Sequence, residues 1–374
     1  MNIFCKDTYK LLKLLDNYDV SIPSKNITEN KYFMGLYRNI KNIFKKQNKL
    51  INISSLNLIE NFNINTYLSN NEFTSEGIHN SIIKDIKYGY EIISDNNTII
   101  YFTKTKIINS KIPVIITHMF TIIKILKILF NRSDNHQKVT YFETYNKKTF
   151  PKNNKIILGP HEVNSGLTFL DFHKNGDIIL YRKEEILKVL IHELIHSNLI
   201  DQKIIFSNKI KNFSDMFCVK YNILLNEAFT ESFATLINIF YIHIINNLDK
   251  DMLNIMFKNE LRYSTYICSK IIKYYDIKKI EDIIKDKNNC TNNFPQKTNV
   301  FAYYILKNIL LQNYISFGDI LNKYTINYKV NDELCIVNII NLITTNIKKF
   351  DKKIINIKSD KNNSLRLCLY ELNN

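Results

Sequence analysis

The sequence contains no tryptophan, and its 374 residues include only seven glycines and five prolines. Asparagine, isoleucine and lysine crowd the whole chain instead. An A+T-rich genome would impose such a bias, and the bias would raise the positive charge without selection for any partner. A hydrophobic fraction of 45% excludes a disordered chain and leaves a globular protein with a sizeable core.

The net charge is strongly positive, with 51 lysines and arginines against 35 acidic residues, or +16. This charge suits a nucleic acid, an anionic membrane surface or an acidic protein substrate. The lysines are scattered, however, and the local clusters at 41–49 and 348–353 are short. We therefore do not favour a nucleic-acid partner, whereas an acidic protein or peptide partner stays open.

The six cysteines form no CxxC pair, which excludes a zinc ribbon and a thiol redox motif. The first residues lack the apolar stretch of a signal peptide. The apolar run 112–130 carries His118, Lys124 and Lys127, which are costly in a bilayer, and the run 233–245 is too short to span one. We therefore expect no membrane span and an intracellular, reducing setting with free thiols.

Apolar periodicity changes along the chain in a way that predicts an α+β fold. We expect a helical extension over 1–85, a mixed sheet with a covering helix and then a metal-binding helix over 86–200, and a mainly helical lobe over 201–374. The expected strands cover 88–94, 98–103, 139–145, 155–158, 166–172, 177–181 and 365–371, with tight turns at 95–97 and 173–176. The expected helices cover 32–49, 113–131, 183–199, 218–247, 251–259, 263–275, 299–312 and 333–347, with Glu184 and Glu185 in the first turn of the third.

The run Ile191-His192-Glu193-Leu194-Ile195-His196 carries the chemistry. Residues four apart on a helix lie about 40° apart around its axis, so His192 and His196 can bind one Zn²⁺. Glu193 lies about 100° further round, where its carboxylate can reach a water on the metal without being a ligand. Zinc lowers the pKa of that water towards about 7, and Glu193 can accept its proton.

A third metal ligand must come from elsewhere in the chain. Metzincins extend the motif with a glycine and a third histidine, but Leu199 and Gln202 occupy those positions, so this class is excluded. Asp201 follows closely, but the Gly-Thr pattern of aspartate-ligated zincins is absent around it. A better candidate is the run 225–231, in which Glu227 and Glu231 are four apart on one helix face. One carboxylate can ligate zinc while the other accepts a hydrogen bond from a ligand imidazole, and spacing does not say which.

The pair HELIH and NEAFTE resembles the gluzincin metallopeptidases, the thermolysin-like and aminopeptidase-like group. The resemblance covers 164–234, and it implies a zincin-like fold and a zinc peptidase. It implies that His192 and His196 are zinc ligands, that Glu227 is the third ligand, and that Glu193 is the general base. By the same comparison, Glu231 is the acid that holds a ligand imidazole, and a strand edge near 166–172 lines the substrate cleft.

Two departures leave the subfamily unassigned. Thirty residues separate His196 from Glu227, so a loop or a short extra helix must intervene, and the exopeptidase signature is absent. The composition suits a large DNA virus of an A+T-rich lineage, which would make this a viral protein, with virion association as one setting.

An oxyanion donor is also expected, and Tyr303 and Tyr304 are the candidates because they begin a helix after a polar loop. Ordinary packing is the competing explanation, since the chain has 23 tyrosines. Two other functions compete with a peptidase. One is a zincin-fold protein without turnover that serves as a structural or binding component, and the other is a basic nucleic-acid-binding protein.

Overall fold

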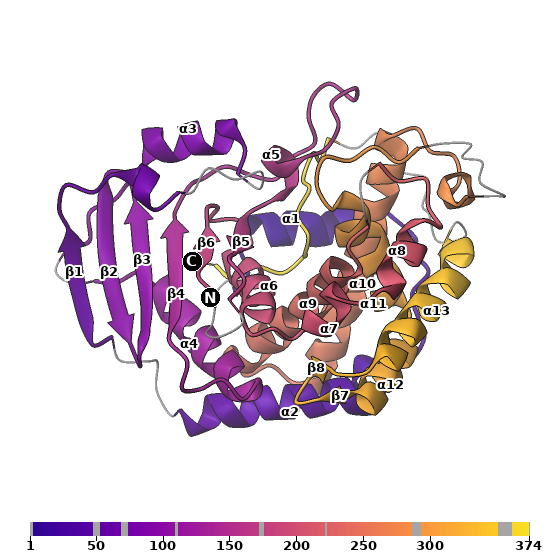
Figure 1. The fold of residues 1–374 in the computed structure, drawn as a ribbon, viewed down its shortest axis with the longest axis horizontal. Coiled ribbons are helices and arrows are strands. Elements are labelled where there is room, and N and C mark those ends of the chain that lie inside the picture. Colours follow the sequence, from indigo (N-terminus) through magenta and orange to yellow (C-terminus); the bar gives the residue numbers. More distant parts are fainter. Residues whose placement is uncertain are drawn as a thin grey trace.

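The computed structural model describes residues 3–47, 53–68, 74–108, 111–171, 176–220, 223–285, 293–350 and 361–373. A mixed sheet forms one side of the molecule and helices from the second half of the chain form the other (Figure 1). The expected α+β class is therefore confirmed. The predicted turn at 173–176 lies almost wholly outside the described residues.

The sheet has six strands in the order β1-β2-β3-β4-β6-β5. The strands β3 and β4 and the strands β4 and β6 pair in parallel, and the other pairs are antiparallel. The predicted hairpin between β2 and β3 is confirmed: Asp95 and Asn96 both have positive φ, as a two-residue turn of this kind requires. The strands are β1 (Ser55–Ile59), β2 (Tyr88–Ser94), β3 (Asn97–Thr103), β4 (Gln137–Phe142), β5 (Gly166–Thr168) and β6 (Ile178–Leu180).

Both faces of the strands β3, β4 and β6 are buried, because alternate residues point to opposite sides and each side packs against a hydrophobic core. In β3, Ile99 and Tyr101 join the main core, whereas Ile100 and Phe102 join a smaller one. The helix α4 (Val114–Leu129) contributes to the main core and makes the crossover between the parallel strands β3 and β4. The helix α3 (Glu76–Asp85) contributes to the smaller core.

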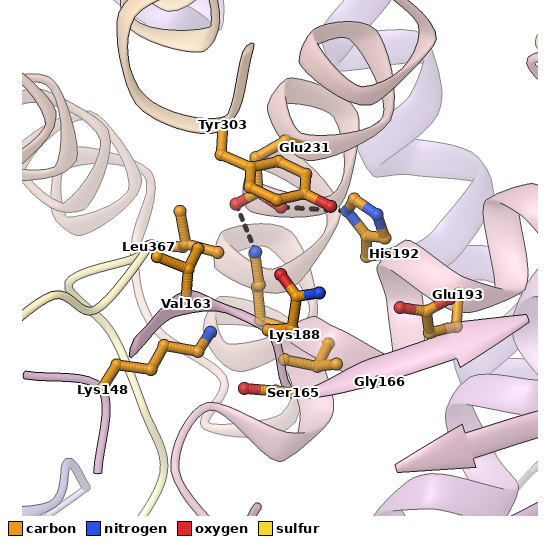
Figure 2. A pocket seen from close by; sticks show the side chains of 12 residues that line it. Lys148, Val163, Ser165, Gly166, Lys188, His192, Glu193, Glu231, Tyr303 and Leu367 are labelled. Atoms are coloured by element: carbon orange, nitrogen blue, oxygen red, sulfur yellow. Dashed lines mark hydrogen bonds and ion pairs between the residues drawn. The ribbon is translucent and has the colours of Figure 1, made fainter. Parts of the chain in front are cut away.

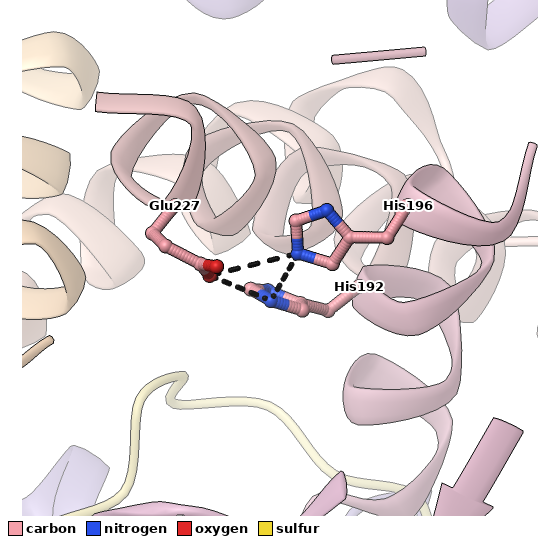
Figure 3. A group of neighbouring side chains, drawn as sticks. All are labelled: His192, His196 and Glu227. Carbon is pink, nitrogen blue, oxygen red and sulfur yellow. Dashed lines mark hydrogen bonds and ion pairs between the residues drawn. The ribbon is translucent and has the colours of Figure 1, made fainter. Parts of the chain in front are cut away.

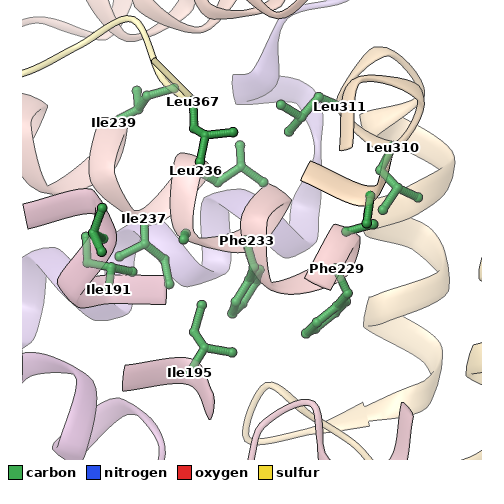
Figure 4. Close-up of a cluster of buried hydrophobic side chains, with 14 of the residues drawn as sticks. Ile191, Ile195, Phe229, Phe233, Leu236, Ile237, Ile239, Leu310, Leu311 and Leu367 are labelled. Carbon is green, nitrogen blue, oxygen red and sulfur yellow. The ribbon is translucent and has the colours of Figure 1, made fainter. Parts of the chain in front are cut away.

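Two helices, α6 (Ile186–Ser197) and α9 (Leu225–Ile245), form the centre of the molecule. All twelve residues of α6 are buried. Ile191 and Ile195 of α6 face the aromatic and aliphatic side chains of α9 in the cluster of Figure 4. This packing holds the predicted HExxH helix and the predicted Asn-Glu helix against each other.

The second half of the chain is mainly helical, as expected, but its boundaries differ. The two helices expected at 251–259 and 263–275 form one helix, and the helix expected at 299–312 begins with a π-helical segment. The remaining elements include α1 (Lys6–Leu15), η1 (Ile27–Glu29), α2 (Lys31–Lys46), η2 (Ile64–Thr66), α5 (Pro160–Val163), α7 (Gln202–Ile205), α8 (Lys209–Ser214), α10 (Lys250–Tyr274), η3 (Ile280–Ile283), η4 (Phe301–Leu306), α11 (Lys307–Gln312), α12 (Tyr314–Tyr324), β7 (Thr325–Ile326), β8 (Lys329–Val330) and α13 (Glu333–Phe350).

The strands predicted at 155–158 and 365–371 are wrong. Many backbone groups of these segments form hydrogen bonds with side chains and not with a neighbouring strand. In the first, the hydroxyl of Tyr274 donates to the carbonyl of Ile156 at 2.7 Å. In the second, the hydroxyls of Tyr304 and Tyr263 donate to the carbonyls of Leu365 and Arg366 at 2.6 and 2.9 Å. An apolar pattern reports burial, which these segments have, but it does not report the hydrogen-bond partner.

The first 85 residues do not form a separate helical extension. The strand β1 pairs with β2 and so belongs to the sheet. The helix α1 packs against α10, and α2 packs against α4, α9 and α12. These residues are thus distributed over both halves of the protein (Figure 1).

The start of α6 also differs from the prediction. Glu185 has a left-handed backbone with φ of 59° and precedes the helix, so neither Glu184 nor Glu185 lies in its first turn. The Glu185 carboxylate instead accepts the backbone N–H groups of Leu367 and Cys368 at 3.1 and 2.6 Å. Glu185 therefore binds the backbone of the C-terminal segment. It does not have the expected role of an acidic residue inside the first turn that interacts with the helix dipole.

Within the described ranges, one helix, α9, has the length and apolar composition of a membrane span, and 94% of its most apolar window is buried inside the protein. Four cysteines have free thiols, as expected, namely Cys5, Cys268, Cys335 and Cys368. Cys218 departs from that expectation because it is disulfide-bonded.

Candidate metal centre

Two histidines of α6 aim their imidazoles at one point. His192 and His196 are buried, and their Nε2 atoms lie 3.1 Å apart (Figure 3). Since the two residues are one helical turn apart, this convergence follows directly from helix geometry.

A carboxylate from α9 completes the group. Glu227 Oε2 lies 3.2 Å from His192 Nε2 and 3.5 Å from His196 Nε2. Four ligands at tetrahedral angles, each about 2.0–2.1 Å from a zinc ion, would be about 3.3–3.4 Å apart. The three observed separations are close to that spacing, so a tetrahedral metal ion would fit among these atoms.

The outer nitrogens of both rings are held by other carboxylates. His192 Nδ1 lies 2.9 Å from Glu231, and His196 Nδ1 lies 2.7 Å from Asp201. With the proton on Nδ1, each neutral ring presents a lone pair at Nε2, directed at Glu227. Three electron-rich atoms thus face one another, and this arrangement is stable only if a proton or a metal cation lies among them.

The pKa values of the two histidines also indicate that positive charge is stabilised in the site. Burial lowers the pKa of His192, but its contacts with Glu227 and Glu231 outweigh burial, so the pKa lies above its usual value. The pKa of His196 lies well above its usual value because Asp201 and Glu227 outweigh burial there. Glu227 Oε2 is buried and has no hydrogen-bond donor among the described residues. The residues present therefore fit a divalent metal.

The turn after α6 brings Asp201 to the site. Leu199, at the position where metzincins have glycine, has φ of 57°, and the N–H groups of Leu199 and Ile200 bond to the carbonyls of His196 and Ile195. These two bonds define a Schellman turn, which reverses the chain at the helix end. The Asp201 carboxylate then lies 2.7 Å from His196 Nδ1, so Asp201 is a hydrogen-bond partner of that candidate ligand and does not converge with the group as the alternative third ligand.

Glu193 lies beside the three converging groups, not among them. Its carboxylate accepts a hydrogen bond from the Thr168 hydroxyl of β5 at 2.8 Å. A Cβ atom on Gly166 would lie 3.1 Å from Glu193 Oε1 and 2.8 Å from a methyl of Leu180, so glycine lets the strand approach this closely. Burial raises the pKa of Glu193 despite the neighbouring histidines. The position and the pKa both suit a group that accepts a proton.

The two candidate tyrosines point in different directions. The Tyr303 ring lies 6.0 Å from the ring of His192 and lines the pocket beside the site. Burial raises the pKa of Tyr303 well above its usual value, so its hydroxyl is a hydrogen-bond donor at neutral pH. The Tyr304 hydroxyl is buried elsewhere and donates to the carbonyl of Leu365. The structure therefore brings Tyr303 to the site and does not bring Tyr304, because adjacent residues of the π-helical segment point to different sides of it.

The thirty residues between His196 and Glu227 contain two short helices, α7 and α8, as the long spacing predicted. The predicted contact between Glu231 and a ligand imidazole is also present, on His192.

Sequence reasoning missed the lysines behind Glu231. Lys188 forms a buried ion pair with Glu231, and Lys307 Nζ lies 3.7 Å from the same carboxylate. Burial alone would raise the pKa of Glu231, but these cations and His192 hold it well below its usual value. Lys188 precedes His192 by four residues, so helical spacing was a signal for it. Nothing local identified Lys307 or Thr168.

These observations define an α+β protein with a His-His-Glu cluster between two central helices. A protein of Acanthamoeba polyphaga mimivirus, described as uncharacterized, is 27% identical to this chain over 192 residues. The match covers 49% of this chain and 49% of that protein, so the chain spans about half the length of the relative it matches. No family model matches the sequence, and no solved structure matches the fold.

Proposed function

We propose that this protein is a zinc-dependent peptidase with a zincin-like fold of the gluzincin type. The observation that carries the proposal is the geometry of three ligand atoms, 3.1, 3.2 and 3.5 Å apart, with an unligated carboxylate beside them. A purely structural zinc site has no need of Glu193 in that position. Bound zinc would supply Lewis acidity that makes water acidic near neutral pH and polarises a carbonyl.

The residues around the metal would then have separate tasks. Glu193 takes a proton from the attacking water and passes it to the leaving amine. Thr168 orients Glu193 through its hydrogen bond. Glu231 and Asp201 orient the two imidazoles and make their Nε2 atoms better ligands.

The substrate would lie along β5. This strand is at the edge of the sheet among the described strands, and none of them pairs with its outer backbone groups. An extended peptide can pair with such an edge and be held past Glu193, which contacts β5 through Thr168. A protein or peptide is therefore the proposed substrate.

The mimivirus relative and the A+T-rich bias support a viral origin. We accordingly propose an intracellular role in an infected cell, with the virus particle as one setting.

Tyr303 is the proposed oxyanion donor. If so, Tyr303→Phe should lower kcat by about 10²-fold or more with little change in KM, because the hydroxyl acts mainly on the charge that develops in the transition state. Steady-state kinetics on one good peptide substrate measures this, with zinc content as a check. The matched control is Tyr304→Phe, which should alter stability rather than kcat. An unchanged kcat in Tyr303→Phe would remove this role.

Metal analysis and a peptide library test the function itself. Purified protein should contain about one zinc ion per chain and should cleave at least some library peptides. A chelator should abolish cleavage, and added zinc should restore it. Stoichiometric zinc with no cleavage of any peptide would favour a zincin-fold binding protein without turnover, and protein that binds no zinc would refute the proposed site.

A further inference from the structure

A narrow pocket with a free volume of ≈ 30 Å³ adjoins the His-His-Glu cluster. Glu193, His192 and Tyr303 form one side of it, and Figure 2 shows Lys148 and Lys188 extending into the same region from the other. Pockets for whole small molecules begin at about 300 Å³, so this one suits only a single small group, such as the carboxylate of a side chain or chain end.

The side chains of both lysines are buried, including their charged ammonium groups. The exposed fraction of the side chain is 1% for Lys148 and 2% for Lys188. Lys148 Nζ pairs with Glu185 at 2.9 Å, and Lys188 Nζ pairs with Glu231. An ammonium group has three N–H donors, so one carboxylate contact leaves each lysine with donors to direct elsewhere.

The two carboxylates behind the pocket are each shared among several donors. Glu231 also receives His192 Nδ1 and a third ammonium, Lys307. Glu185 also accepts two backbone N–H groups of the C-terminal segment. Each of the two carboxylates is thus shared with other donors, so neither is reserved for its lysine.

A further donor in the pocket lacks a partner. The Ser165 hydroxyl is buried and has no hydrogen-bond partner among the described residues. Val163, Val189 and Leu367 form apolar walls around these polar groups. A hydroxyl and two ammonium groups within apolar walls form a site for one small anion that can accept several hydrogen bonds.

We propose that this pocket binds a carboxylate group of the substrate. The carboxylate belongs either to an acidic side chain next to the scissile bond or to the free C-terminus of a peptide. This inference rests on the proposed peptidase function, and it gives the buried lysines of the pocket a role in specificity.

The test compares peptides that differ in one charge. One set, with amidated C-termini, carries Asp, Asn or Ala at each position flanking the scissile bond. A second set has neutral side chains and ends, one residue after that bond, in a free carboxylate or an amide. We expect kcat/KM to be about 10- to 100-fold higher for the charged member of one set, the scale of hydrogen bonds to charged groups. A preference within the first set identifies an acidic side chain, and one within the second set identifies a terminal carboxylate.

Equal rates for charged and neutral members of both sets would overturn the proposal. If the wild-type protein cleaves none of these peptides, the peptidase function fails, but the pocket is still tested. Calorimetric dissociation constants of the same peptides with zinc-loaded protein should then show the same charge preference, and their equality would refute the pocket.

A matched pair of variants tests the pocket directly. Ser165→Asp adds a carboxylate next to the lysines and should remove most of the charge preference, because the added group occupies the proposed site. Ser165→Asn has the same size without the charge and should lower the preference far less. Zinc content and thermal unfolding check that both variants fold. Equal loss of preference in the two variants would show that shape, not charge, determines selectivity, and would refute the proposal.

Discussion

Replacing Glu193 with glutamine should nearly abolish hydrolysis while zinc remains bound. Glutamine keeps the shape of the side chain and can still meet Thr168, but it cannot accept a proton. The expected loss in kcat is about 10²- to 10⁴-fold, the range of general acid–base catalysis. Zinc content should not change, because Glu193 is not among the three converging groups.

The measurement is kcat on a library-selected peptide, with zinc determined on the same sample. Glu76→Gln, an exposed change of the same kind on α3, is the matched control and should leave both values unchanged. Undiminished turnover in Glu193→Gln would require a different base. Loss of zinc in that variant would instead make Glu193 a ligand, contrary to the geometry.

The second large effect separates Glu227 from Glu231, which are one turn apart on α9. Glu227→Gln should strongly weaken zinc binding, as should His192→Ala and His196→Ala, because these three side chains supply the converging atoms. Glu231→Gln should cost about 10- to 100-fold in zinc affinity or activity, as expected for a partner of a ligand imidazole. Competition titrations with a zinc chelator measure the affinities.

The buried lysines behind Glu231 complicate that variant. Glu231→Gln leaves Lys188 and Lys307 without their carboxylate, and breaking a buried ion pair costs about 3–5 kcal/mol of stability. The affinities must therefore be compared at a temperature where thermal unfolding shows both variants to be folded. Adding Lys188→Met to Glu231→Gln removes one unpaired charge and provides a control. If Glu231→Gln empties the site and Glu227→Gln does not, the roles are reversed, and if neither does, the third ligand lies elsewhere.

The sequence predicted the parts of this site that depend on local geometry. His192 and His196 converge because residues four apart share a helix face, and the same rule placed Glu227 and Glu231 together. The hairpin at 95–97 could be predicted because it also depends on local geometry. Asp and Asn tolerate the left-handed backbone that the turn needs. By contrast, the strands expected at 155–158 and 365–371 failed, because burial does not reveal which groups satisfy a backbone.

By itself, then, the sequence determined the α+β class, the HExxH helix and the two acidic residues that are candidates for the third metal ligand. Only the tertiary structure decided that Glu227 meets both Nε2 atoms while Glu231 meets His192 Nδ1, that Asp201 holds His196, and that Tyr303 faces the site while Tyr304 does not. It also brought Lys307 to Glu231 and the segment around Leu367 to Glu185. The physical reason is distance along the chain. Helical spacing relates residues a few positions apart, whereas these partners come from different elements, and their meeting depends on how α6, α9 and the C-terminal segment pack in one core.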